Sequence, residues 1–481
     1  MKKNYLFLLL FAWIFTGGIY AADLIRITSP AYCSDIQGNT TIQIAAPTYT
    51  TVELRCWQQG TGQGTFARLG TVTLDEKGAG SIVFPADEFP RGPLTIRLRG
   101  TNKANYTDNC YLQLYNKGGI SWNEGLPADP PAAAGMQLVF ADDFNGTLSI
   151  GPDPSIHTYY DHKPPHGSQD FSSLPFRDFN SIRNPFKQMD TYLRIRANEN
   201  NQSSGIISSY FSNNTGFDAS IPSYFECRFI GPNAPGSWPA FWLLSKKTNI
   251  GDNNEPCDEL DIIEAYGNLP DHEKYLYRIA VHPWGQTGEH VDMAKIFYNS
   301  TGIINMSKFD ILSSWFETPH IYGCKITETN TIYYCDNKEV ARHPTMPISK
   351  VRPMYFLINM GTGAHPVDLS RYGGLADMYV DYVRVYSGEK SSTPSIEQPD
   401  VNVDVYPNPV DESLTVSLNV NNPADVVVGI YNTLGQQISS YREYQQGEIK
   451  IPVDTSNMSN GIYLAKINIG DIQVNKKIIK Q

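Results

Sequence analysis

The chain has 481 residues, which is room for about three domains of roughly 100–200 residues each. Hydrophobic residues make up 41% and charged residues 18%, so the chain can form packed cores and is not wholly disordered. The formal net charge of −11 repels phosphate backbones, and we therefore expect no nucleic-acid partner.

The first residues have the pattern of a secretory signal peptide. Lys2 and Lys3 precede an apolar run, Leu6–Phe15, and small residues follow up to Ala21. This run is about half the roughly 20 residues that a membrane-spanning helix needs, which disfavours a membrane anchor. We predict a cleaved signal peptide over residues 1–22 and no transmembrane span after its removal. The mature protein is then exported, and is either soluble or attached to the surface.

The rest of the chain predicts an all-β protein with three domains. Residues 23–120 contain strand-like alternation, for example in Val52–Cys56 and Leu94–Leu98, and short strands at this spacing favour an immunoglobulin-like sandwich. A Pro/Ala-rich linker over residues 121–135 separates it from a second strand-and-turn domain over residues 136–387.

A polar segment over residues 388–400 predicts a second linker. In the last domain, residues 401–481, the apolar residues Leu414, Val416, Leu418 and Val420 alternate with polar ones. This alternation predicts a small β-sandwich.

The chain has seven cysteines, and export makes disulfides possible. An odd number leaves at least one cysteine unpaired or intermolecular. Cys324 and Cys335 flank a predicted hairpin, so their side chains could lie opposite each other.

Three acids within six residues, Glu259, Asp261 and Glu264, form the most informative motif. On a strand, Glu259 and Asp261 share a face because they are two residues apart, whereas Glu264 at i+5 points to the other face. A β-bulge at Ile262–Ile263 would bring Glu264 to the same side. We therefore expect a bulged strand with all three acids on one face.

Such a carboxylate cluster suits glycosidic cleavage, in which one ionised carboxylate attacks and a second, protonated one acts as general acid. The alternatives are an acidic strand that faces solvent and a calcium loop. The segment upstream of the acids, Gly236–Leu244, contains Trp238 as a candidate platform for a sugar ring, while Phe241, Trp242 and Leu243 read as core residues.

The sequence ELDIIE after GSWPAFWLL resembles glycoside hydrolase family 16, the laminarinase, agarase and carrageenase group. Further similar pieces are FADDFNG, YLRIRA, SGIISS, YFECR and VDYVRVY, which occur in the expected order over residues 136–387. The resemblance implies a central β-jelly-roll whose concave face binds an internal stretch of polysaccharide. The long segment over residues 161–186 is expected to form a loop at the cleft rim.

By this resemblance Glu259 corresponds to the nucleophile, Asp261 to a helper acid and Glu264 to the general acid/base. His282 matches a position beside the acids, with a structural histidine as the alternative, and Trp284 is a second candidate stacking residue. Glu226 and Arg228 share a strand face and either bind sugar hydroxyls or pair with each other. Asp381 matches a position that binds calcium in some members, with a buried salt bridge as the alternative. No cofactor is expected to be required, apart from a possible structural calcium.

The last domain resembles the type IX secretion sorting domain, on the pieces YPNPV, IYNTLGQ, GIYL and the basic end KKIIK. This resemblance implies the type IX secretion machinery as a partner, beside the polysaccharide substrate. It also implies that the protein passes the periplasm and the outer membrane to become secreted or bound to the cell surface. A generic carbohydrate-binding β-domain is the alternative.

The function expected from these features is that of a secreted retaining endo-β-glycanase acting on a β-glucan or β-galactan. A transglycosylase on the same scaffold and a non-catalytic glycan-binding surface protein remain as alternatives.

Overall fold

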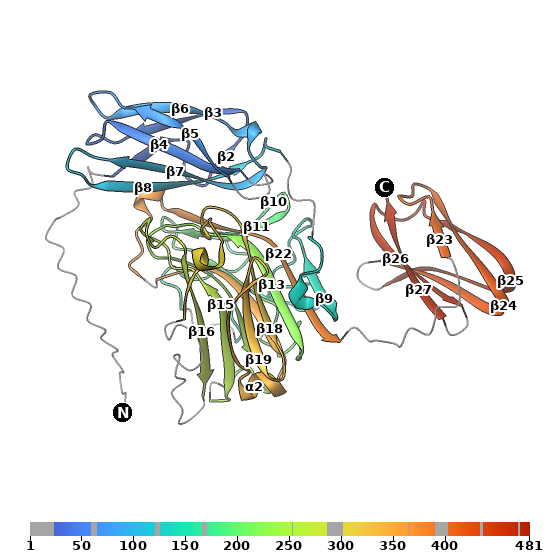
Figure 1. Ribbon diagram of the computed structural model, residues 1–481. Helices are drawn as coiled ribbons and strands as arrows, with labels where there is room; N and C mark the ends of the chain where they lie inside the picture. The colour runs from blue at the N-terminus through green and yellow to red at the C-terminus, as the bar shows by residue number, and fades with distance from the viewer. Residues whose placement is uncertain are drawn as a thin grey trace. The chain divides into compact units, whose positions relative to one another are not determined.

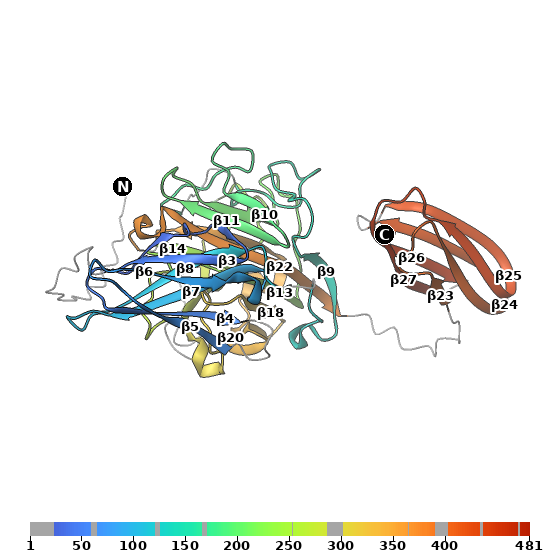
Figure 2. The ribbon, with the colours of Figure 1, turned by 90° about the horizontal axis from the view of Figure 1, so that it is seen from above.

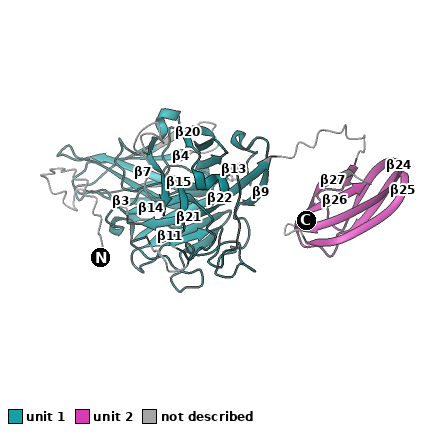
Figure 3. Ribbon diagram, turned by 90° about the horizontal axis from the view of Figure 1, so that it is seen from below, with its two compact units in different colours: residues 1–390 teal, residues 391–481 magenta. Residues whose placement is uncertain are grey.

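The computed structural model describes residues 24–58, 65–120, 126–165, 171–252, 254–285, 302–363, 365–389, 403–432, 436–469 and 472–481. The predicted signal peptide lies outside these residues. The chain divides into two compact units, residues 1–390 and 391–481, coloured teal and magenta in Figure 3. No helix within the described ranges is long and apolar enough to cross a membrane.

The first unit begins with a sandwich of two sheets, drawn in blue in Figure 1. One sheet has the order β1 (Arg26–Ser29), β3 (Asn39–Ala45), β6 (Ala79–Pro85), and the other has the order β2 (Asp35–Ile36), β8 (Thr107–Asn116), β7 (Gly92–Thr101), β4 (Thr51–Gln58), β5 (Thr65–Thr73). Every second side chain points inward, as the sequence predicts: Val52, Leu54 and Cys56 of β4 are all buried.

Two larger sheets follow and form the jelly-roll that the family resemblance implies. The outer sheet has the order β10 (Phe186–Met189), β11 (Tyr192–Asn198), β22 (Leu375–Glu389), β13 (Ser223–Ile230), β18 (His320–Ile326), β19 (Asn330–Cys335), β20 (Lys338–Pro344), and β9 (Met136–Asp142) also pairs with β22. The inner sheet has the order β12 (Gly205–Ser208), β21 (Met354–Thr362), β14 (Ser237–Ser245), β15 (Cys257–Glu264), β16 (Leu276–Trp284), β17 (Ile303–Asn305).

Helical segments in the described part of the chain are short: η2 (Ala86–Glu88), η3 (Pro131–Ala133), η4 (Met306–Phe309), α2 (Pro347–Val351) and η5 (Ser370–Tyr372). Within the inner sheet, β21 lies between β12 and β14 and is buried along its whole length. The inner sheet therefore has a well-packed centre, and β15 lies next to that centre.

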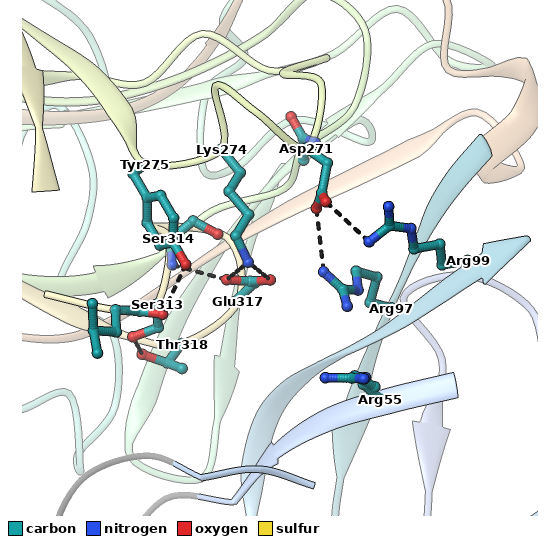
Figure 4. A network of polar contacts seen from close by, with 12 residues as sticks. Arg55, Arg97, Arg99, Asp271, Lys274, Tyr275, Ser313, Ser314, Glu317 and Thr318 are labelled. Carbon is teal, nitrogen blue, oxygen red and sulfur yellow. Dashed lines mark hydrogen bonds and ion pairs between the residues drawn. The ribbon is translucent and has the colours of Figure 1, made fainter. Parts of the chain in front are cut away.

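The N-terminal sandwich packs directly on the jelly-roll, as Figures 1 and 2 show. Arg97 and Arg99 of β7 both form ion pairs with Asp271, at 3.2 and 3.3 Å (Figure 4). Asp271 belongs to the connection between β15 and β16, so the sandwich contacts the loop that follows the three acids. Buried aromatic contacts join the two parts as well, for example Tyr111 with Phe316 at 4.8 Å between ring centres.

The second unit is a small β-fold of β23 (Val403–Tyr406), β24 (Ser413–Asn432), β25 (Gln437–Asp454), β26 (Gly461–Ile469) and β27 (Ile472–Lys480). The long β24 pairs with β25 throughout, with β23 along its first half and with β26 along its second half. The register of its pairing with β25 shifts between Val420 and Ala424. The predicted alternation holds, since Leu414, Val416, Leu418 and Val420 are all buried.

All seven cysteines are buried and free. The expectation that Cys324 and Cys335 lie opposite each other is wrong. In the β18–β19 pairing Cys324 is opposite Tyr333, and Cys335 is opposite Tyr322.

Candidate active site

The predicted β-bulge in β15 is present. Asp261 is opposite Ala280 on β16, and Glu264 is opposite Arg278, so two register steps on β16 correspond to three on β15. The pairing with β14 shows the same shift, because Asp261 is opposite Trp242 and Glu264 is opposite Ala240. The extra residue turns Glu264 to the face that carries Asp261.

The three acids line a cavity of about 290 Å³ on the exposed face of the inner sheet. Its other lining residues come from the neighbouring strands and from the segment after β9: Lys163, Phe171, Trp238, Ala240, Trp242, His282, Trp284 and Asn359. We call this cavity the groove. Lys163 and Phe171 belong to the segment that the sequence predicts as a rim loop.

Glu264 is mostly buried and has one hydrogen-bond partner among the described residues, Tyr266. The Tyr266 hydroxyl donates a hydrogen bond of 2.8 Å to Oε1 of Glu264. Burial raises the pKa of Glu264 above its ordinary value, and the Tyr266 hydrogen bond opposes the shift by stabilising the carboxylate. A raised pKa is what a carboxyl group needs to act as a general acid near neutral pH.

Asp261 is buried and contacts His282, with 3.3 Å between Oδ2 and the imidazole Nε2. Burial and the charge of Glu259 raise the pKa of Asp261, while the hydrogen bond to Asp261 raises the pKa of His282 to about 9. Asp261 and His282 therefore compete for one proton, because a charged imidazolium at His282 favours the ionised form of Asp261. Since the contact is direct, we assign that proton to the imidazole at neutral pH.

Glu259 is held by Trp284, whose indole Nε1 donates a hydrogen bond of 3.1 Å to Oε2 of the carboxylate. Trp284 in turn stacks on His282, with ring centres 5.3 Å apart and planes inclined by 22°. Its side chain is half exposed. Trp284 therefore orients a carboxylate and also lines the groove.

Trp238 lies in the groove, as predicted, and packs against Phe171 and Tyr266 with ring centres 5.5 and 5.6 Å away. Its indole N–H is buried and has no hydrogen-bond partner among the described residues. The prediction that Trp242 is only a core residue is wrong. It forms part of the groove lining, and its Nε1 donates to Oδ1 of Asn359 at 2.8 Å.

Glu226 and Arg228 are not in the groove, which corrects the expectation that they bind sugar. Both lie on β13 of the outer sheet. Glu226 is fully buried and forms an ion pair of 2.8 Å with Arg384, and it also accepts hydrogen bonds from the hydroxyls of Tyr224 and Tyr382. The two residues do not pair with each other either.

Arg228 pairs instead with Asp381, at 2.7 Å. Asp381 is thus part of a buried salt bridge, the alternative that the sequence left open. Because a guanidinium already neutralises this carboxylate, the contact disfavours a calcium ion at Asp381.

Groups of side chains that could hold a metal occur at three places in the described ranges: His320–Cys335–Asp336, Asp161–His162–Asp178 and Glu259–Asp261–His282. The last group coincides with the acids of the groove, and its ligand atoms lie within 4.8 Å of one another. The contact between Asp261 and His282 explains this closeness without an ion.

Three acids on one face of a jelly-roll sheet form the arrangement expected of a glycosidase site. Two segments of the chain match known families. Residues 178–364 match the family described as Glycosyl hydrolases family 16. Residues 404–481 match the family described as Secretion system C-terminal sorting domain. The chain therefore has a segment that matches family 16 glycosyl hydrolases, followed by a segment that matches a secretion sorting domain. The match to the sorting domain indicates a protein that is secreted or held at the cell surface.

Among curated proteins, the chain is similar to two from Rhizobium meliloti (strain 1021). It is 33% identical over 217 residues to endo-1,3-1,4-beta-glycanase EglC, covering 42% of this chain and 40% of that protein. It is 29% identical over 236 residues to endo-1,3-1,4-beta-glycanase ExsH, covering 46% of this chain and 44% of that protein. The matches thus span less than half of either relative's length.

Among solved structures, the laminarinase from Flavobacterium sp. UMI-01 is 21% identical, with a TM-score of 0.39. The match covers 52% of this chain and all of that one.

Proposed function

We propose that the protein is a secreted retaining endo-β-glycanase. The observation that carries this proposal is the bulge in β15, which brings Glu259, Asp261 and Glu264 to one face over an open groove. The raised pKa of Glu264 supports its role as general acid. Glu259, oriented by Trp284, is the nucleophile.

In the first step, Glu264 protonates the oxygen of the leaving sugar while a Glu259 carboxylate oxygen attacks the anomeric carbon. In the second step, the Glu264 carboxylate takes a proton from water, and that water displaces Glu259 from the sugar. Asp261 lies between the two glutamates in the sequence and contacts His282. This contact helps to keep Glu259 ionised and Glu264 protonated. Net retention at the anomeric carbon follows from the two inversions.

The relatives support a β-1,3- or mixed-linkage β-glucan as backbone, since two are endo-1,3-1,4-beta-glycanases and a third is a glucan endo-1,3-beta-glucosidase. A β-galactan is the alternative backbone. Transglycosylation, in which a sugar takes the place of water in the second step, uses the same residues. The type IX secretion machinery is the proposed partner for export.

The test is to incubate the purified protein with laminarin, lichenan, agarose, porphyran, carrageenan and keratan, and to follow the products by size and by proton NMR. Internal cleavage with a β-configured first product supports the proposal. An α-configured first product contradicts the retaining mechanism, and sugar-transfer products alone identify a transglycosylase. Binding without any cleavage supports the non-catalytic alternative.

A further inference from the structure

A second cavity, of about 170 Å³, adjoins the groove beyond Trp284. We call it the lysine pocket, and its principal lining residues are Lys163, Ser245, Lys247, Cys257, Trp284 and Tyr355. Lys163 and Trp284 line both the groove and this pocket. Because Trp284 also contacts Glu259, the pocket lies directly beside the proposed nucleophile.

Two ammonium groups meet in the lysine pocket. Burial raises the pKa of the Cys257 thiol, and the charges of Lys247 and Lys163 oppose that shift, so both charges act on this one site. Lys247 Nζ donates to the backbone oxygen of Asp252 at 2.9 Å, and Lys163 Nζ lies 5.5 Å from the centre of the Trp242 ring. Both are partial contacts that leave ammonium hydrogens free for a ligand.

Neither lysine forms an ion pair with a described residue, although both are partly buried. Other lysines of this unit do form ion pairs. Lys246, the neighbour of Lys247 in the chain, pairs with Asp218 at 3.0 Å, and Lys274 pairs with Glu317 at 3.0 Å. A partly buried cation without a counter-ion is costly, and the cost is recovered when a ligand brings the opposite charge.

Of the three groove acids, Glu259 lies nearest the lysine pocket, and its charge also acts on Cys257. Its Oε2 already accepts the Trp284 hydrogen bond. The charge of Asp258 acts on Cys257 as well, but its carboxylate is fully buried and accepts hydrogen bonds of 2.8 Å from the N–H and the hydroxyl of Ser349. Among the acids that act on Cys257, Glu259 is therefore the one that lines the groove, where it faces the two lysine charges. The local excess of positive charge favours an anion over a neutral hydroxyl.

We propose that the lysine pocket binds an anionic substituent, a sulfate ester or a carboxylate, of the sugar chain in the groove. The proposal rests on the glycanase function proposed above and specifies its substrate class as an acidic β-glycan. The charged substituent sits on the sugar that contacts Glu259 or on its neighbour, with Lys163 and Lys247 as its two donors. Both substituents present oxygen acceptors to the ammonium groups, and the experiment separates them.

The experiment compares one backbone in three forms: laminarin, sulfated laminarin and carboxymethylated laminarin with matched degrees of substitution. The full chain is tested as wild type, as Lys163→Gln, as Lys247→Gln and as the double variant. Lys187→Gln is the control, since Lys187 is an exposed residue of β10 on the outer sheet. The readout is the ratio of kcat/KM on each anionic form to kcat/KM on laminarin.

The wild-type ratio should exceed one for the sulfated or the carboxymethylated form, and the preferred form identifies the substituent. The double variant should lower this ratio by about tenfold or more, as expected for the loss of charge-assisted hydrogen bonds. The control should keep the wild-type ratio. Equal losses on neutral and anionic forms, or a ratio that the lysine variants leave unchanged, would overturn the proposal.

Gel retardation separates this proposal from the catalytic one. In gels that contain the same three polysaccharides, the wild type should migrate more slowly in an anionic gel than in plain laminarin, and the double variant should lose the difference. If this holds although no polysaccharide is cleaved, the catalytic proposal fails and the pocket stands. If wild type and double variant migrate alike in every gel, the pocket proposal fails whatever the activity.

Discussion

Tyr266 donates its hydroxyl hydrogen to Oε1 of Glu264 across 2.8 Å, just after the bulge in β15. Tyr266 follows Glu264 by two residues, so the alternation of the strand continues past its last paired residue. The hydrogen bond stabilises the charged carboxylate, while burial favours the neutral acid. The protonation state of the proposed general acid is thus a balance between these two effects.

Replacing Tyr266 by Phe should shift this balance toward the neutral acid. The variant loses the hydrogen bond that lowers the pKa of Glu264, so that pKa rises further. Because the first step needs protonated Glu264, the basic limb of the pH profile of kcat/KM should move to higher pH. A profile measured on the same substrate for wild type and variant checks this, and a limb displaced to lower pH would contradict it.

Glu259→Gln and Glu264→Gln should each remove activity while leaving the fold intact. A glutamine at position 264 cannot deliver a proton, and loss of general acid catalysis costs roughly 10²–10⁴ in rate. A glutamine at position 259 cannot form the covalent intermediate, so its loss should be at least as large. Glu273→Gln, at a half-exposed neighbouring acid, is the matched control. Near-normal turnover in either groove variant would refute the assigned roles.

The sequence was sufficient to predict the bulge, because acids at i, i+2 and i+5 reach one strand face only with an extra residue. Trp242 could have been assigned to the groove by the same argument, since it lies four residues after Trp238 and shares its face. Its large apolar ring instead indicated core packing, and the structure shows that it packs under the groove and lines it. Tyr266 was missed because it follows the motif.

Glu226 and Arg228 show where sequence reasoning fails. Their spacing indicates that both side chains lie on the same face of one strand. It does not show which of the two sheets contains that strand. Their partners, Arg384 and Asp381, lie more than 150 residues away in the chain. The pairing is therefore decided by the arrangement of β13 beside β22, and no local pattern reveals it.

The buried Glu226–Arg384 pair should matter for stability and not for catalysis. Glu226→Ala leaves Arg384 as an uncompensated buried charge, which costs about 3–5 kcal/mol of unfolding free energy. The partly exposed pair Glu339–Arg342 is the control, because Glu339→Ala should cost at most about 1 kcal/mol. Chemical denaturation measures both. A Glu226 variant of normal stability and lowered sugar affinity would restore the sugar-binding role that the structure argues against.

The contact between His282 and Asp261 should make stability depend on pH in a defined window. The pKa of His282 is about 9 in the folded protein against an ordinary value of 6.5, so folding favours the charged imidazole. Its contribution to stability is therefore complete below pH 6.5 and is lost as the pH rises through about 9. The difference in thermal midpoint between wild type and His282→Gln should accordingly be largest near pH 6 and shrink by pH 10. His272→Gln, at a largely exposed histidine, should show no such trend, and a His282 difference that grows with pH would overturn the assignment of the proton to the imidazole.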